Sequence, residues 1–196
     1  MRASQYADAL AGLAKLGLAQ FGRQALVGGN YALLQERTFT PNPDFWTAMA
    51  WKQLMGTEVL NVTHLGAGEP ATLRVYAHCE SARRHAKAAE GRERAVTVLL
   101  INVDPSTQFD VTVAGAAGTA RDREEWHLTA PSDDTRSRTA LLNGKPLAMG
   151  GDGQLPALEP RYGGDGTPIG VAPLSIAFVV LPSARCPLGG QQPRPT

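Results

Sequence analysis

The chain has 196 residues, of which 19 are basic and 18 acidic, so its formal net charge is +1. This balance gives no support for nucleic-acid binding, and no apolar run approaches the roughly 18 residues that a membrane-spanning helix needs. With 21 glycines and 14 prolines, the composition favours a turn-rich β protein over a helical bundle.

The first 56 residues predict a helix, a strand and a second helix. A helix over 4–17, capped by Ser4, follows from apolar residues that recur every three or four positions, at Tyr6, Leu10, Leu13 and Leu16. Residues 18–27 are predicted to form a short buried strand. The second helix spans 43–55, with Asn42 as N-cap, Pro43 in the first helical position and Gly56 at its end.

A long loop over 28–40 separates the predicted strand from the second helix. It opens with Gly28, Gly29, Asn30 and Tyr31. A strand, a loop and a proline-capped helix in this order are typical of the last unit of a (β/α)₈ barrel, whose binding groups lie in such loops. Because a complete barrel has about 250 residues, we expect the rest of it to precede Met1. On the residues alone, Gly28-Gly29-Asn30 is better explained as a plain turn with positive φ.

After Gly56 the pattern changes to short segments of alternating or β-branched residues separated by turns. The predicted strands are 58–64, 71–79, 95–103, 108–113, 120–128, 138–142, 146–149, 169–172 and 174–181. Asn143-Gly144 predicts a tight hairpin turn. Short strands at regular spacing predict an antiparallel β-sandwich over 57–187. Residues 188–196 are predicted to be a disordered tail.

The chain has two cysteines, Cys79 and Cys186, too few for a disulfide scaffold and without the spacing of a zinc site. Two unrelated buried thiols and one long-range disulfide are both open on this evidence. A disulfide would require an oxidising compartment. The sequon Asn61-Val62-Thr63, a candidate glycosylation site at Asn61, indicates the same compartment.

No acidic residue has a convincing catalytic context, and the four histidines show no metal-binding spacing. Glu36 is interpreted as a solvated loop charge, and Glu124-Glu125 as a solvated face or a cross-strand pair. The basic cluster over 81–94 could contact an acidic polysaccharide, but a solvated hairpin connection is the favoured interpretation. Asp152 and Asp165 lie in glycine-rich turns that lack the full ligand pattern of a calcium loop.

Seven blocks in the same order resemble the C-terminal part of glycoside hydrolase family 79, the heparanase-like endo-β-glucuronidases of plants and green algae. The resemblance covers about residues 6–186. Its blocks are RQALVGGNYALL (23–34), PNPDFWTAMAWKQLMG (41–56), LRVYAHC (73–79), REEWHLTAP (123–131), LLNGKPLAM (141–149), LPALEP (155–160) and IGVAPLSIAFVVLP (169–182). Tyr6 departs from the pattern, since the family more often has tryptophan there.

The resemblance implies a fold that is mainly β, an antiparallel β-sandwich (57–187) preceded by the last helix-strand-helix piece of a (β/α)₈ barrel (1–56). In such enzymes two glutamates perform retaining hydrolysis, and both would precede residue 1, so no catalytic residue is expected here. Gly29, Asn30 and Tyr31 would bind the sugar that is cleaved. Cys79 and Cys186 would pair as a disulfide.

The implied function is hydrolysis of glucuronide links in acidic glycans by a protein of which this chain is an inactive part. The implied partners are an acidic polysaccharide or proteoglycan glycan and the missing N-terminal barrel, without nucleic acid, metal or cofactor. Peripheral membrane association is an open alternative. The implied location is secreted, cell wall or endolysosomal. The competing hypothesis is a non-catalytic β-sandwich that binds glycan or stabilises a partner.

Overall fold

The computed structural model describes residues 2–29, 31–65, 71–88, 91–114, 122–134, 136–164 and 166–187. Within them, the elements in chain order are α1 (Arg2–Lys15), α2 (Pro43–Leu54), β1 (Met55–Leu60), β2 (Leu73–Glu80), α3 (Ala82–His85), β3 (Ala95–Asn102), β4 (Phe109–Val111), β5 (Arg123–Thr129), η1 (Pro131–Asp133), β6 (Leu141–Leu142), β7 (Lys145–Pro146), β8 (Arg161–Gly163), β9 (Ile169–Val171) and β10 (Ser175–Arg185). The predicted tail at 188–196 lies outside the described residues.

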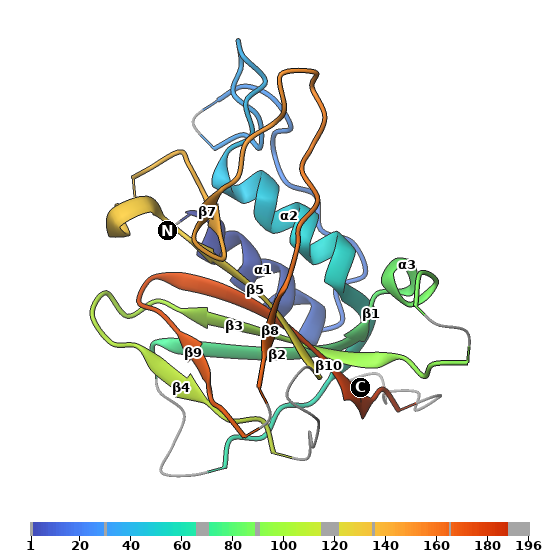
Figure 1. Cartoon of the computed structure of the whole chain (residues 1–196). Helices are drawn as coiled ribbons and strands as arrows, with labels where there is room; N and C mark the ends of the chain where they lie inside the picture. The colour runs from blue at the N-terminus through green and yellow to red at the C-terminus, as the bar shows by residue number, and fades with distance from the viewer. Residues whose placement is uncertain are drawn as a thin grey trace.

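The described strands form one large antiparallel sheet and one small one. The large sheet has eight strands in the order β1-β2-β3-β10-β5-β6-β7, with β8 also paired to β5, and β4 pairs with β9 in the small sheet. Figure 1 shows α1 and α2 on one side of the large sheet and the β4–β9 pair on the other. The prediction of a mainly antiparallel β protein is therefore confirmed, while the assignment of 57–187 to a sandwich and of 1–56 to a barrel remnant stays a prediction.

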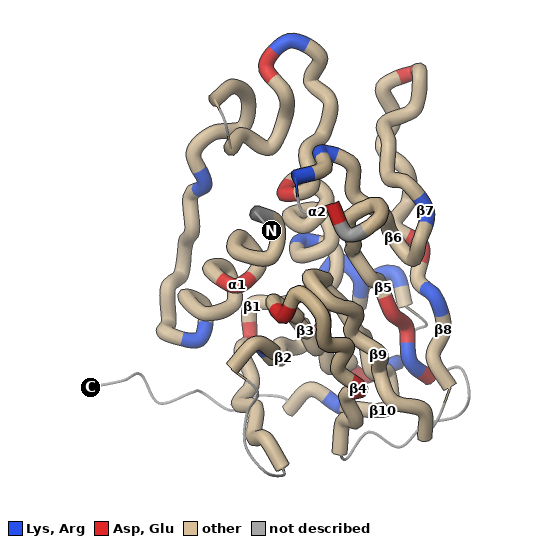
Figure 2. The backbone as a smooth tube through the Cα atoms, turned by 90° about the vertical axis from the view of Figure 1, so that its left-hand side faces the viewer, with Lys and Arg blue, Asp and Glu red and all other residues tan. Residues whose placement is uncertain are grey.

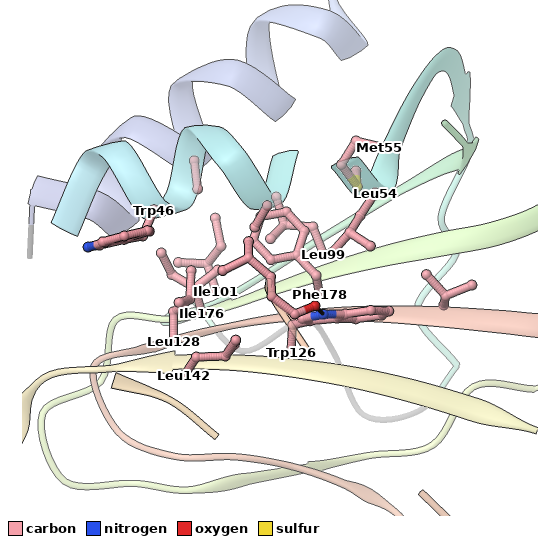
Figure 3. Packing of buried hydrophobic residues seen from close by; sticks show 14 of the residues in the cluster. Trp46, Leu54, Met55, Leu99, Ile101, Trp126, Leu128, Leu142, Ile176 and Phe178 are labelled. Carbon is pink, nitrogen blue, oxygen red and sulfur yellow. Dashed lines mark hydrogen bonds between the residues drawn. The ribbon is translucent and has the colours of Figure 1, made fainter. Parts of the chain in front are cut away.

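The helices and the large sheet enclose the larger core. Trp46 and Leu54 of α2 belong to the same buried cluster as Ile101, Trp126 and Phe178 of the sheet (Figure 3). Trp126 is 1% exposed, and its indole N–H donates to the Leu158 carbonyl at 2.7 Å. This bond anchors the irregular segment 155–160 against the sheet. A second apolar cluster lies between the other face and β4–β9, with Val98, Leu100 and Val179 opposite Ile169 and Val171.

Helix α1 packs with a different face from the one predicted. Ala7 and Ala11 are fully buried against the core, whereas Leu10 and Leu13 are half-buried and Leu16 is 76% exposed. Small alanines let the helix axis approach α2 and the sheet closely. The larger tyrosine and leucine side chains of the predicted face would prevent this approach. The helix also begins at Arg2, so Ser4 lies inside it and is not its cap.

The predicted strand over 18–27 is wrong. These residues form no strand, and their only sheet-like contact among the described residues is a single parallel bridge from Val27 to Leu34. A strand needs a neighbour along its length to satisfy its N–H and C=O groups, and the described chain offers one only at the end of this segment, where the N–H groups of Leu33 and Leu34 donate to the Ala25 and Leu26 carbonyls at 3.2 and 2.9 Å. Most of it is exposed.

Helix α2 and strand β1 are continuous, and the predicted end of the helix at Gly56 is wrong. The helix ends at Leu54, and Met55 already has extended geometry. A Cβ on Gly56 would lie 2.5 Å from the Cys79 carbonyl oxygen and 2.8 Å from the guanidinium of Arg94. Gly56 therefore serves the close approach of β1 to β2.

The hairpin predicted at Asn143-Gly144 forms as expected. Leu141 pairs with Pro146 and Leu142 with Lys145, so the two residues between them make the turn. Both have positive φ, 49° at Asn143 and 81° at Gly144, as a primed turn requires.

Candidate functional site

The loop singled out from the sequence lies at the surface, beside the N-terminal end of α2. Gly28 and Gly29 both adopt positive φ, at 83° and 78°, and a Cβ on Gly29 would meet no other atom within 4 Å. The turn geometry, and not crowding, therefore favours glycine here. Tyr31 is 55% exposed. Asn30 lies outside the described residues, so its predicted role is untested.

Arg23 holds this loop in place. Its guanidinium donates to the Tyr31 carbonyl at 2.9 Å and forms an ion pair with Asp44, the first-turn acid of α2. The same group lies 4.5 Å from the ring centre of Tyr6, a cation–π geometry. Burial raises the pKa of Tyr6 despite the opposing charge of Arg23. One arginine thus connects α1, the loop and α2, a role that the sequence pattern did not reveal.

The segment around this loop exposes many large apolar side chains. Between residues 16 and 39 these are Leu16, Leu18, Phe21, Leu26, Val27, Tyr31 and Phe39, with 37% to 76% of each exposed. Exposed apolar residues concentrated in one segment of a chain indicate a surface that another body covers.

A cleft of about 840 Å³ lies between α2, α3 and the segment 155–160. Its floor holds Glu80, which is fully buried, forms an ion pair with Arg84 Nε at 2.9 Å, and accepts from Arg92 Nη2 at 2.5 Å and the Ala95 backbone N–H at 3.3 Å. Arg84 also pairs with Glu124 and lies 5.2 Å from the ring of Trp126. Burial lowers the pKa of Arg84, although Glu80 opposes that shift.

The basic segment 81–94 is the hairpin connection between β2 and β3 that the sequence favoured, and Arg83 and Lys87 are exposed in it, but it is not solvated throughout. Ser81 caps the short helix α3 by accepting from the Arg84 backbone N–H at 3.2 Å, and its own hydroxyl donates to the Gln53 carbonyl at 2.5 Å. Two of its arginines reach inward to Glu80. A carboxylate that is inaccessible to water must be paired, which explains this arrangement.

A second buried carboxylate belongs to Glu125. It follows Glu124 on β5 and therefore lies on the opposite face of that strand. It accepts from Arg123 at 2.7 Å, Arg161 at 2.9 Å and His127 Nε2 at 2.6 Å. Burial would raise the pKa of Glu125, but the bonds from His127 and Arg161 outweigh it and lower the pKa to about 2. Figure 2 shows acidic and basic positions interspersed along β5 and β8. Of the two sequence interpretations of Glu124-Glu125, the cross-strand pair is confirmed, since Glu125 lies opposite Arg161 on β8 and pairs with it at 2.8 Å. The solvated face is wrong for Glu125, which is 2% exposed.

Cys79 and Cys186 form a disulfide in the structure, with their Cα atoms 5.3 Å apart across 107 residues of sequence. The Cys186 backbone N–H also donates to the Arg94 carbonyl at 2.8 Å. The neighbouring His78 bonds to the Gly56 carbonyl through Nδ1 at 2.7 Å, and burial lowers its pKa. Asn61, the predicted glycosylation site, is exposed.

Neither a metal centre nor a membrane span is evident in the part of the chain that the structure describes. No three His, Cys, Asp or Glu side chains gather there as metal ligands. The helices among these residues are all too short or too polar to cross a bilayer.

Comparison with known proteins gives clear sequence relatives, although no model of a protein family matches the chain. It is 35% identical to heparanase-like protein 2 of Arabidopsis thaliana over 93% of this chain and 37% of that protein. It is 36% identical to baicalin-β-D-glucuronidase of Scutellaria baicalensis over 90% of this chain and 31% of the enzyme. Inactive heparanase-2 of Mus musculus is 31% identical over 86% of this chain and 29% of that protein. The chain thus spans about a third of these relatives.

Two solved structures share the fold at lower sequence identity. A bifunctional glucanase-xylanase from a metagenome library, CelM2, aligns with a TM-score of 0.53 and 16% identity over 92% of this chain and 28% of that one. The GH51 arabinofuranosidase of Xanthomonas axonopodis pv. citri aligns with a TM-score of 0.52 and 16% identity over 91% of this chain and 35% of the other.

Proposed function

We propose that this chain, a member of the heparanase-like family, is the C-terminal part of a retaining glycoside hydrolase of family 79 that cleaves glucuronide links in acidic glycans. The observation that carries the proposal is the 35–36% identity to heparanase-like protein 2 and to a β-D-glucuronidase over at least 90% of the chain. The proposed location, secreted or in the cell wall or endolysosome, is supported by the Cys79–Cys186 disulfide and the exposed sequon at Asn61, which both fit an oxidising compartment.

In this proposal the catalytic glutamates lie in a barrel contributed by residues that precede the chain. The exposed apolar residues between 16 and 39 support a surface that such a barrel covers. The loop at Gly29 and Tyr31, fixed by Arg23, would lie at the mouth of the barrel, where its exposed phenol can contact a sugar.

The test has two steps. Full-length sequencing of the native transcript should show coding sequence upstream of Met1, with a barrel that carries an Asn-Glu motif and a second strand-end glutamate. The full-length protein should then hydrolyse an aryl β-D-glucuronide. Tyr31→Ala should lower kcat/KM by roughly tenfold, the value of one lost polar contact, whereas Tyr162→Ala should change it little.

Tyr162 is a matched control because it is 61% exposed on β8, against 55% for Tyr31. Equal kcat/KM for both variants would remove Tyr31 from the site. A transcript that begins at Met1 would refute the catalytic proposal for this product.

A non-catalytic module is the second candidate function. Relatives at 31% identity are named inactive heparanase-2, and the two carboxylates on the cleft floor, Glu80 and Glu124, are both held by arginines. Such a module would bind glycan or stabilise a partner chain without hydrolysis. Binding of an acidic glycan by a full-length protein that cleaves no glucuronide would favour it.

A further inference from the structure

The cleft beside α3 is separate from the loop at Tyr31, and none of the described residues between 23 and 44 lines it. Helices α2 and α3 lie on the same side of the sheet (Figure 1) and contact each other. Lys52 of α2, Arg83 of α3 and Lys87, which follows α3, line the cleft together with the segment 155–160. Its volume of about 840 Å³ falls in the range of pockets that hold small ligands.

The charges of the cleft do not cancel. On the floor, Arg84 and Arg92 are matched by Glu80 and Glu124. On the walls, Lys52, Arg83 and Lys87 are exposed, and none has a carboxylate within ion-pair distance among the described residues. Glu159 is the remaining acidic residue of the lining. The mouth of the cleft therefore carries an excess of positive charge above a floor that is already paired.

We propose that this cleft binds the anionic group, a carboxylate or a sulfate, of an acidic sugar. Lysine and arginine donors bind both groups through charge-assisted hydrogen bonds. The floor is held by buried ion pairs and by the hydrogen bond from Trp126 to Leu158. Little conformational entropy is therefore lost when a ligand binds. That the anion is carried on a sugar rests on the proposed function, whereas the binding of an anion does not.

The experiment measures binding to the whole 196-residue chain by calorimetry at low salt. The probes are inorganic sulfate, an unsulfated uronic-acid oligosaccharide, a sulfated neutral oligosaccharide and an unmodified neutral oligosaccharide of the same length. The test variant combines Lys52→Ala, Arg83→Ala and Lys87→Ala. The control combines Arg136→Ala, Arg138→Ala and Lys145→Ala, three exposed positions outside the cleft, so both variants lose the same charge.

We expect the two acidic oligosaccharides to bind and the neutral one not to bind. The cleft variant should weaken binding about tenfold, as three exposed charge contacts allow, and the control should change it less than about twofold. The two acidic probes show whether carboxylate or sulfate is preferred. Since all three cleft positions are exposed, single variants provide the same comparison if the triple variant does not fold.

Equal weakening by both variants, or no binding of any anionic probe, would overturn the proposal. Binding of sulfate without binding of either acidic oligosaccharide would refute the sugar as the carrier of the anion. Hydrolysis is not measured in this experiment. A failure of the glycosidase proposal and a failure of this one are therefore distinguishable.

Discussion

Replacing Glu80 by glutamine removes one negative charge and preserves the size of the side chain. Glu80 is fully buried, forms an ion pair with Arg84, and accepts hydrogen bonds from Arg92 and the Ala95 backbone N–H. After the substitution Arg84 keeps Glu124, but Arg92 loses its only carboxylate partner among the described residues. Breaking a buried pair costs about 3–5 kcal/mol. Because both arginine side chains are about a quarter exposed, we expect the lower end, about 3 kcal/mol.

Glu58→Gln is the matched control. Glu58 forms a bidentate pair with Arg94 at 2.8 and 2.9 Å, and the hydrogen bonds from Arg94 lower its pKa to about 2. Its side chain is nevertheless 52% exposed, so solvent screening should keep the loss below about 1 kcal/mol. Urea unfolding, followed by circular dichroism, measures the free energy of unfolding of each variant against the wild type. Equal losses, or a loss below about 1 kcal/mol for Glu80→Gln, would refute the view that burial makes this ion pair important.

Two further predictions concern stability. Replacing Cys79 and Cys186 by serine should lower the free energy of unfolding by about 4–5 kcal/mol on the chain-entropy model, since the bond closes a loop of 107 residues; a loss below about 1 kcal/mol in urea would contradict it. The pKa of Glu125 is lowered to about 2 from an ordinary 4.5. Its ionised form therefore stabilises the fold at pH values above 4.5, and this stabilisation is lost as the pH falls toward 2. The stability gap between the wild type and Glu125→Gln should therefore narrow below about pH 4.5, and a constant gap would contradict the assignment.

The strands and the hairpin could be predicted from local pattern. Every strand from β1 to β10 except β8 overlaps or adjoins a predicted segment, because β-branched runs between turn residues are a local signal. The Asn143-Gly144 turn is likewise local, since both residues tolerate positive φ. The sequence could not show which strands pair, and β10 lies between β3 and β5 only in the folded sheet.

The errors have a common cause, which is dependence on distant partners. The apolar run at 18–27 has the composition of a strand, but a strand forms only beside another. The basic segment 81–94 has the composition of a solvated loop, but Arg84 and Arg92 turn inward because Glu80 lies buried beneath them. Gly56 resembles a helix end, yet its role is set by the backbone of Cys79 and Glu80 in the next strand.

Three consecutive residues at the end of β2 join the parts of the chain that form the cleft. Cys79 is bonded to Cys186, Glu80 binds Arg84 and Arg92, and Ser81 connects α3 to α2 through the Gln53 carbonyl. Arg94 donates to the Glu80 carbonyl at 2.6 Å, and its own carbonyl accepts from the Cys186 N–H at 2.8 Å. The same contacts that stabilise this corner also fix the cleft floor. A charged cleft held on rigid elements loses less entropy on binding than one built on loops, and this coupling is why the corner suits a binding surface as well as a structural one.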